Sequence, residues 1–188
     1  MVGHAVVELG AGLGLVGICA ALRGCHVLMT DVSSVTEFIN CNIEANCKTP
    51  DSAVDGVAGP WERARSVGRG SAACMELDWM KDVDRQAHSS GHDLSKVAYV
   101  VACEVVWLQE LLQPYVVTLA TLLHSDIRPV CYMSYTIRGT KQSNIFTSEV
   151  LVRQTLIAAG CIITDLPAFA SVTPDGEDVV FWKVQAAE

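Results

Sequence analysis

Glycines follow the first apolar segment of the chain at a spacing typical of nucleotide binding. Residues 5–9 suit a buried parallel strand, and Gly10, Gly12 and Gly14 come directly after it. Glycine permits a positive φ and lets a ligand approach the backbone closely. Residues 15–22 read as a helix, whose first amides would face such a ligand. The pattern therefore predicts a nucleotide-cradling turn between a strand and a helix.

One candidate ligand for this turn is a dinucleotide. Gly12, Gly14 and Gly17 satisfy the G-x-G-x-x-G spacing of dinucleotide enzymes. In a dinucleotide site, however, the first glycine follows the strand directly, which makes Gly10 the first and puts Leu15 in the third place. The match to a dinucleotide site is therefore weak.

A second predicted strand, residues 25–30, ends at Asp31, which lies 19 residues beyond Gly12. An aspartate in this place can accept hydrogen bonds from both ribose hydroxyls, in dinucleotide and methyltransferase sites alike. The alternative role is a helix N-cap. That role is less needed here because Ser34 and Glu37 have the spacing of a capping box for the next helix, whose apolar residues include Phe38.

Two further predicted strands also end in residues that could do chemistry. The third strand ends at Asp78 and Trp79, which could hydrogen-bond and stack on an adenine, or equally could cap a helix and fill the core. The apolar strand 97–103 ends at Glu104, and Trp107 follows three residues later. Parallel sheets bind ligands at the carboxyl ends of their strands, which favours a functional role for Glu104 over a helix cap.

The elements that must position these residues alternate along the chain. Strands and helices follow one another up to residues 130–134 and 146–159, and two strands close the chain at 161–166 and 179–184. This order predicts a doubly wound, Rossmann-like α/β fold with a mostly parallel seven-stranded sheet and one antiparallel strand near its edge.

Composition limits both the architecture and the partners. A chain of 188 residues with 51% hydrophobic and 18% charged residues is expected to form a single domain over 1–188, with a surface loop at 48–72. The net charge of −8 argues against nucleic-acid binding and is compatible with a basic or neutral protein segment as partner. The sequence does not indicate an oligomeric state.

Neither a metal site nor a membrane segment is predicted. The eight cysteines lie mostly in apolar stretches without a C-x-x-C pair, which indicates reduced thiols. His88 and His92 are four residues apart but read as loop. Glu8 and the dense glycines argue against a membrane span in residues 5–22, and no signal peptide is recognisable. We expect a cytoplasmic protein, with the nucleus as a second compartment.

Three segments together carry a resemblance to a known family. Residues 8–17 read Glu-Leu-Gly-Ala-Gly-Leu-Gly-Leu-Val-Gly, residues 77–79 read Leu-Asp-Trp, and residues 101–107 read Val-Ala-Cys-Glu-Val-Val-Trp. The first resembles motif I of the class I, seven-strand S-adenosylmethionine-dependent methyltransferases, and the last is similar to the segment that carries a D-x-x-Y motif. Residues 132–140, with Arg138 and Gly139, resemble the strand and loop that follow. The combination is similar to the methyltransferase-like family 16 protein-lysine methyltransferases over nearly the whole chain, the 48–72 loop excepted.

The resemblance implies S-adenosylmethionine as cofactor and a role for each matching residue. Glu8, Gly10, Ala11 and Gly12 would surround the methionine part, and Asp31 would bind the ribose. The adenine would lie at Trp79, which Asp78 joins, and Cys103 would end a strand facing the cofactor. The predicted catalytic residues are Glu104 and Trp107, in the acid and aromatic positions of the D-x-x-Y motif, along the channel for a lysine of a protein substrate.

Lysine methylation suits this pair of residues. The amine, with a reference pKa of about 10.4, must lose its proton before it attacks a methyl carbon. A carboxylate raises that pKa, so Glu104 is better suited to orienting the ammonium than to acting as a strong base. Trp107 adds a cation–π attraction. Glutamate in place of aspartate lengthens the arm, and tryptophan in place of tyrosine removes a hydroxyl.

Alternative functions follow from the same residues. Family members carry a tryptophan-containing segment before motif I, and this chain starts four residues before its first predicted strand, so we expect that segment to be missing. A catalytically silent binding module of the same fold is therefore one alternative. A small-molecule methyltransferase is another, and an NAD-dependent oxidoreductase is disfavoured by Leu15.

Overall fold

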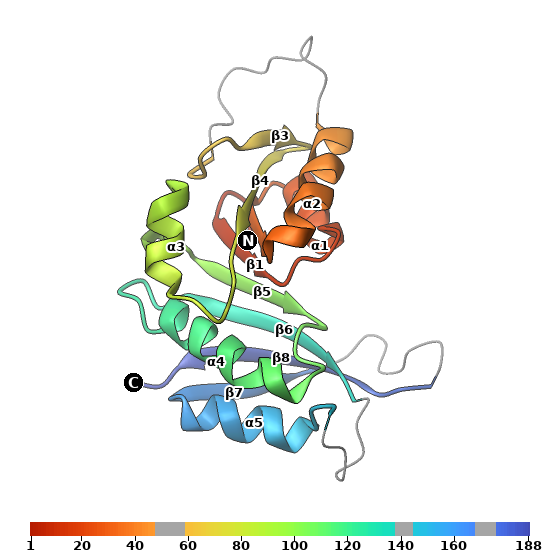
Figure 1. The fold of residues 1–188 in the computed structure, drawn as a ribbon, viewed down its shortest axis with the longest axis vertical. Coiled ribbons are helices and arrows are strands. Elements are labelled where there is room, and N and C mark those ends of the chain that lie inside the picture. The colour runs from red at the N-terminus through yellow and green to blue at the C-terminus, as the bar shows by residue number, and fades with distance from the viewer. Residues whose placement is uncertain (48–58, 138–144, 168–175) are drawn as a thin grey trace. The chain divides into compact units, whose positions relative to one another are not determined.

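The computed structural model describes residues 1–47, 59–137, 145–167 and 176–188 (Figure 1). These residues form two compact units, Met1–Val101 and Ala102–Glu188. The prediction of a single domain over the whole chain stays a prediction.

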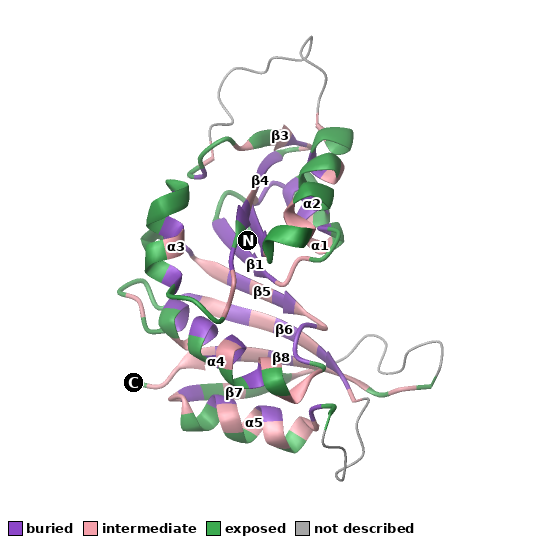
Figure 2. Ribbon diagram, in the orientation of Figure 1, coloured by how far each residue is buried: buried purple, intermediate pink, exposed green. Residues whose placement is uncertain are grey.

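Parallel strands form the centre of the first unit. Strand β1 (Ala5–Leu9) pairs in parallel with β2 (His26–Asp31) on one side and with β5 (Tyr99–Cys103) on the other. Strand β4 (Gly70–Glu76) continues the sheet beyond β2 in parallel, and the short strand β3 (Arg65–Val67) pairs antiparallel with β4. All five residues of β1 are buried, as expected for a central strand (Figure 2).

Three helices belong to the first unit, and all of them pack on β4. Helix α1 (Leu15–Leu22) also packs on β2, as does α2 (Ser33–Asn46), and α3 (Val83–Ser90) follows β4 in the chain. A 3-10 helix, Leu94–Lys96, leads into β5. The apolar faces of α1 and α2 meet the strands in one core cluster, which includes Val6, Ile18, Ala21, Val27, Met29, Ile39 and Ile43.

The second unit is built on antiparallel strands. Strand β8 (Val179–Ala186) pairs antiparallel with β6 (Val130–Thr136) and with β7 (Cys161–Leu166). Helix α5 (Glu149–Ala158) packs on β7, and α4 (Gln109–Leu123) packs on α5 and β8. The largest fully buried side chains of this unit are Trp182, Tyr115, Leu119, Leu123 and Leu156.

The architecture is the predicted mixed α/β, Rossmann-like class. The described residues contain eight strands against the seven predicted, and β3 is the addition. The predicted bounds of α1 (15–22) and of β7 (161–166) are confirmed residue for residue.

The predicted surface loop at 48–72 is wrong in its last part. Residues 65–67 form β3, and β4 begins at Gly70. A turn with Gly68 at φ 58° joins the two strands, and Val67 pairs with Gly70. The strand β3 is too short to show an alternating pattern in the sequence. Residues 48–58 lie outside the described residues.

Two local predictions about helices are also corrected. His88 lies on α3 and not in a loop, while His92 follows the end of that helix at Gly91. The predicted capping box does not form, because α2 begins at Ser33 and its N-cap is Val32, without a side-chain bond. Within the described part of the chain, no cluster of metal-ligating side chains occurs, and no helix has the length and apolar character needed to span a bilayer.

Candidate functional site

The turn between β1 and α1 leaves an open cradle at the carboxyl end of β1. The Ala11 amide donates to the Thr30 carbonyl oxygen at 2.9 Å, and the Gly14 amide donates to the Ala11 oxygen at 2.8 Å. Gly12 has a φ of 56°, and a Cβ added there would meet no atom within 4 Å. Backbone conformation therefore requires glycine at this position, while the space beside it remains available to a ligand.

Asp31 joins this turn to the end of β2. Its Oδ2 accepts a hydrogen bond from the Gly12 amide at 2.8 Å, and its Oδ1 accepts one from the Val32 amide at 2.8 Å. Each carboxylate oxygen keeps a second lone pair for a ligand hydroxyl. The predicted juxtaposition of Gly12 and Asp31 is thus present, and the alternative role of Asp31 as the N-cap of α2 is not.

Glu8, on β1 two residues before Gly10, carries a buried carboxyl group. It is 3% exposed, and its Oε2 has no hydrogen-bond partner among the described residues. Burial raises the pKa of Glu8 from 4.5 to about 7; the nearby Gly17 backbone opposes this rise, and the charge of Asp31 adds to it. An unsatisfied buried carboxylate oxygen is costly, and a cationic ligand group would relieve that cost.

Gly17, to which sequence reasoning gave no role of its own, lies close to the Glu8 carboxyl group. A Cβ at this helical position would lie 2.4 Å from Glu8 Oε2 and 2.5 Å from Met29 Cγ. Only glycine lets α1 approach the carboxyl group this closely. The available signal was a glycine on the buried face of a predicted helix, where it counted only as part of the dinucleotide and motif I patterns.

Asp78 and Trp79 follow β4, and the carboxylate of Asp78 stabilises a turn. Asp78 Oδ1 accepts from the Met80 amide at 2.9 Å, and Oδ2 lies 3.1 Å from Lys81 Nζ. These contacts lower the pKa of Asp78, the Met80 hydrogen bond most. The side chain of Gln86, which sequence reasoning missed, accepts from the Asp78 amide at 2.8 Å and donates to its carbonyl at 3.0 Å. Trp79 is half-buried.

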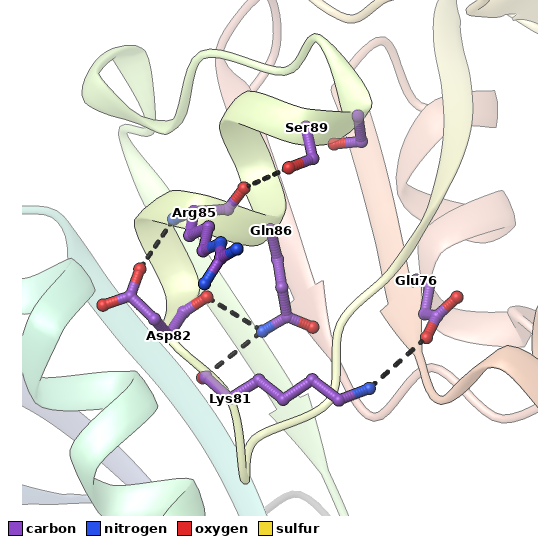
Figure 3. Close-up of a pocket in the computed structure, with 7 residues that line it drawn as sticks. Glu76, Lys81, Asp82, Arg85, Gln86 and Ser89 are labelled. Atoms are coloured by element: carbon purple, nitrogen blue, oxygen red, sulfur yellow. Dashed lines mark hydrogen bonds and ion pairs between the residues drawn. The ribbon is translucent and has the colours of Figure 1, made fainter.

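A hollow of about 580 Å³ lies beside this turn (Figure 3). Residues of the end of β4, of α3 and of the segment between them line it, with both signs of charge: Glu76, Lys81, Asp82, Arg85, Gln86, Ser89 and Ser90. Lys81 reaches from its rim towards Glu76, at 3.9 Å. None of the predicted site residues lines this hollow.

Glu104 belongs to the second unit, where β6 holds both its backbone and its carboxylate. Its φ is 59°, a left-handed conformation that costs energy for any residue with a side chain. The Glu104 amide donates to the Ser134 carbonyl at 3.2 Å. Its Oε1 accepts from Ser134 Oγ at 3.1 Å and its Oε2 from the Thr136 amide at 3.0 Å. Sequence reasoning missed Ser134 and Thr136.

Two other predicted residues accompany Glu104 in this unit. Cys103, the last residue of β5, is half-buried, and Trp107 is 44% exposed. Trp107 is therefore not a core residue, in keeping with a contact to a ligand. Arg138 and Gly139 lie outside the described residues.

The first unit fits the cofactor that the resemblance implies. Glu8 offers an unpartnered carboxylate oxygen to the ammonium of an amino-acid tail, and the open turn at Gly12 leaves space for that tail. Asp31 keeps lone pairs for the hydroxyls of a ribose.

Solved structures share this fold. A TehB-like SAM-dependent methyltransferase from Corynebacterium glutamicum is similar with a TM-score of 0.60 and 11% identity, over 99% of this chain and 82% of that one. The methyltransferase domain of bacterial CtHen1 is similar with a TM-score of 0.62 and 15% identity, over 98% of this chain and 90% of that one. At these identities the likeness shows the fold.

Curated relatives are closer in sequence. Protein N-lysine methyltransferase METTL21A of Danio rerio is 31% identical over 145 residues, which are 77% of this chain and 55% of the relative. EEF1A lysine methyltransferase 3 of Mus musculus is 33% identical over 122 residues, 65% of this chain and 40% of the relative. The chain thus spans about half the length of the curated relatives it matches.

The family model described as lysine methyltransferase matches residues 1–151. This match covers more than half of the sequence and includes the glycine turn, Asp31, Glu104 and Trp107. The chain belongs to the lysine methyltransferase family.

Proposed function

We propose that the chain acts as an S-adenosylmethionine-dependent methyltransferase that modifies lysine side chains of a protein substrate. The observation that carries the proposal is the buried, unsatisfied carboxylate oxygen of Glu8 on the strand that leads into the open turn at Gly12, with Asp31 bonded to the same turn. Family membership supports the choice of cofactor and of lysine.

The first unit provides the groups that hold the cofactor. In the proposed complex, the Glu8 carboxylate would neutralise the ammonium of the amino-acid tail, the turn of Gly10, Ala11 and Gly12 would leave room for that tail beside the backbone, and Asp31 would accept from the ribose. We assign the adenine contact to Trp79 and not to Asp78, because the carboxylate of Asp78 already stabilises the following turn. The bound cofactor supplies an activated methyl group on a positively charged sulfur.

The second unit provides the groups that receive the lysine. Glu104 accepts a hydrogen bond from the ammonium and orients it, and Trp107 contacts its apolar stem. The lysine nitrogen would have to lose a proton to water before it could accept the methyl group, and Glu104 would hold it in position meanwhile. Most of the rate then comes from placement of the reacting atoms, because the donor is already activated.

Charge supports a protein substrate. The chain carries a net charge of −8, which attracts a lysine-bearing segment and repels nucleic acid. One relative is named for methylation of EEF1A, which makes that protein a suitable first substrate to test. We propose the cytoplasm, with the nucleus as a second compartment, as the place where this reaction occurs.

The test is methyl transfer from tritium-labelled S-adenosylmethionine to recombinant EEF1A and, in parallel, to a mixed cell extract. Label on protein, located on lysine by mass spectrometry and lost in Glu104→Gln, is the expected result. The variant keeps the size of the side chain, removes its charge and replaces one acceptor oxygen with an NH2 group, and it should bind S-adenosylhomocysteine like the parent chain.

Two outcomes would contradict the proposal in different ways. Binding of S-adenosylhomocysteine without transfer to any protein would identify a catalytically silent module. Label that appears only in small molecules of the extract would identify a small-molecule methyltransferase.

A further inference from the structure

Two aromatic side chains of the second unit, from distant parts of the sequence, lie together at the surface. The rings of Trp107 and Phe146 have centroids 6.4 Å apart and an angle of 32° between their planes. Trp107 is 44% and Phe146 is 39% exposed, whereas Trp61 and Trp182 are buried. Aromatic rings that lie together at the surface present an apolar face on which a ligand can bind.

Buried hydrogen bonds hold the backbone on both sides of this pair. Thr147 is fully buried; its hydroxyl donates to the Val106 carbonyl, and its amide donates to the Trp107 carbonyl at 3.1 Å. The Thr147 carbonyl accepts from the Tyr135 hydroxyl at 2.7 Å, and Tyr135 stacks on Trp182. The two rings therefore project from a backbone that is already ordered before a ligand arrives.

Gln109 adds a second connection between the same two segments. Its amide donates to the Ile145 carbonyl at 2.9 Å, and its Nε2 donates to the Phe146 carbonyl at 3.0 Å. Leu108 and Phe146 also form an isolated antiparallel bridge. The position of Phe146 beside Trp107 is thus fixed by main-chain contacts and not by the aromatic contact alone.

The chemistry of this surface selects a cation with an apolar stem. The face of an aromatic ring attracts a positive charge, with tryptophan the strongest. Glu104, three residues before Trp107, adds a carboxylate that accepts from Ser134 and from Thr136. Lysine is the side chain that combines a compact ammonium with a flexible aliphatic stem.

We propose that Phe146 contacts the substrate and, together with Trp107, forms an aromatic surface that binds the side chain of the target lysine. This inference rests on the proposed function and adds to it a specificity-determining residue outside the motifs of the sequence analysis. A cation–π attraction needs no N–H group, so the surface retains lysine after its methylation, while the hydrogen bond to Glu104 is lost when the last N–H is replaced.

The test uses the intact chain labelled with 5-fluorotryptophan and followed by fluorine NMR. The Trp107 resonance, assigned with Trp107→Phe, should shift on addition of choline or Nα-acetyl-lysine methylamide. The neutral choline analogue 3,3-dimethyl-1-butanol, which has the same shape, should not shift it. An equal response to the neutral analogue would show a merely apolar surface and overturn the proposal.

Variants of Phe146 give the quantitative result. Loss of one cation–π partner at an exposed site, about 0.5–1 kcal/mol, corresponds to an affinity about two- to fivefold weaker in Phe146→Leu. Phe146→Tyr, which keeps the ring, should bind like the parent chain. Phe38→Leu is the matched control, since Phe38 is an exposed phenylalanine, at 57%, on α2. Unchanged affinity in a folded Phe146→Leu would overturn the proposal.

Methyl transfer separates this inference from the proposed function. Phe146→Leu should raise KM for a lysine-bearing protein about two- to fivefold, with affinity for S-adenosylhomocysteine unchanged. If transfer proceeds and KM does not change, the inference fails and the proposed function stands. If the parent chain neither binds S-adenosylhomocysteine nor transfers methyl, the proposed function itself fails.

Discussion

Replacement of Glu8 by glutamine is expected to stabilise the free protein at alkaline pH and to weaken cofactor binding. Glu8 is 3% exposed, and burial raises its pKa from 4.5 to about 7 in the folded chain. When folding raises the pKa of a carboxyl group, the folded state loses stability as the pH rises above the pKa that the group has in the unfolded chain. The loss begins near pH 4.5, grows up to about pH 7 and is constant above that value.

The size of this effect follows from the two pKa values of Glu8. The difference between 4.5 and about 7 corresponds to about 3 kcal/mol at pH 8. At pH 5 the same carboxyl group is mostly protonated in the folded chain, and the cost is less than about 1 kcal/mol. Glutamine is neutral at both pH values. The free energy of unfolding of Glu8→Gln relative to that of the parent chain should therefore be about 2–3 kcal/mol more favourable at pH 8 than at pH 5.

The assay is urea unfolding of the parent chain and Glu8→Gln at pH 5 and pH 8, at one ionic strength. Glu37→Gln, an exposed change on α2, is the control and should shift stability by less than about 0.5 kcal/mol at either pH. A stability difference between Glu8→Gln and the parent that is equal at the two pH values would refute the reasoning. Binding of S-adenosylhomocysteine to Glu8→Gln should weaken by about tenfold or more, because a hydrogen bond to a charged group is lost.

Three further substitutions test separate parts of the structure. Gly17→Ala should lower the free energy of unfolding by about 1–2 kcal/mol, because overpacking outweighs the gain in helix propensity; greater thermal stability would show that α1 is not tightly packed. Thr147→Val should lower the free energy of unfolding, measured by chemical denaturation, by about 1–3 kcal/mol, because a buried hydrogen bond is lost. The exposed Thr121→Val should change it little, and equal losses in the two variants would contradict the role of the buried hydrogen bond. Ser134→Ala should reduce the rate of methyl transfer about fivefold, because the Ser134 hydroxyl holds the Glu104 carboxylate, and it should leave cofactor affinity unchanged. Ser134→Thr should restore the activity. An effect on cofactor affinity alone would contradict this positioning role of Ser134.

Sequence alone predicted the parts of the fold that depend on local patterns. The segment from β1 to α1 combines an apolar run, glycines and a helical stretch without interruption, and its bounds follow from those residues. Helix α3 was missed because only Val83 and Ala87 are buried in an otherwise polar helix. Phe38, expected among the apolar residues of α2, is 57% exposed, because apolar spacing does not establish which residues meet the core.

In the candidate site, too, local sequence patterns predict some contacts and leave others unpredicted. Gly12 and Asp31 could be paired from sequence, since parallel neighbouring strands end at one edge of a sheet. The contacts of Glu104 with Ser134 and of Trp107 with Phe146 join residues 30 and 39 positions apart. They depend on strand register and on the conformation after β5, which no local pattern contains.

Calorimetric titration with S-adenosylhomocysteine tests the central claim most directly. The account predicts saturable binding that is lost or strongly weakened in Asp31→Asn, with no binding of NAD under the same conditions. Binding of NAD, or binding of S-adenosylhomocysteine that is indifferent to Asp31→Asn in a folded protein, would contradict the claim that Gly12, Asp31 and Glu8 form the cofactor site.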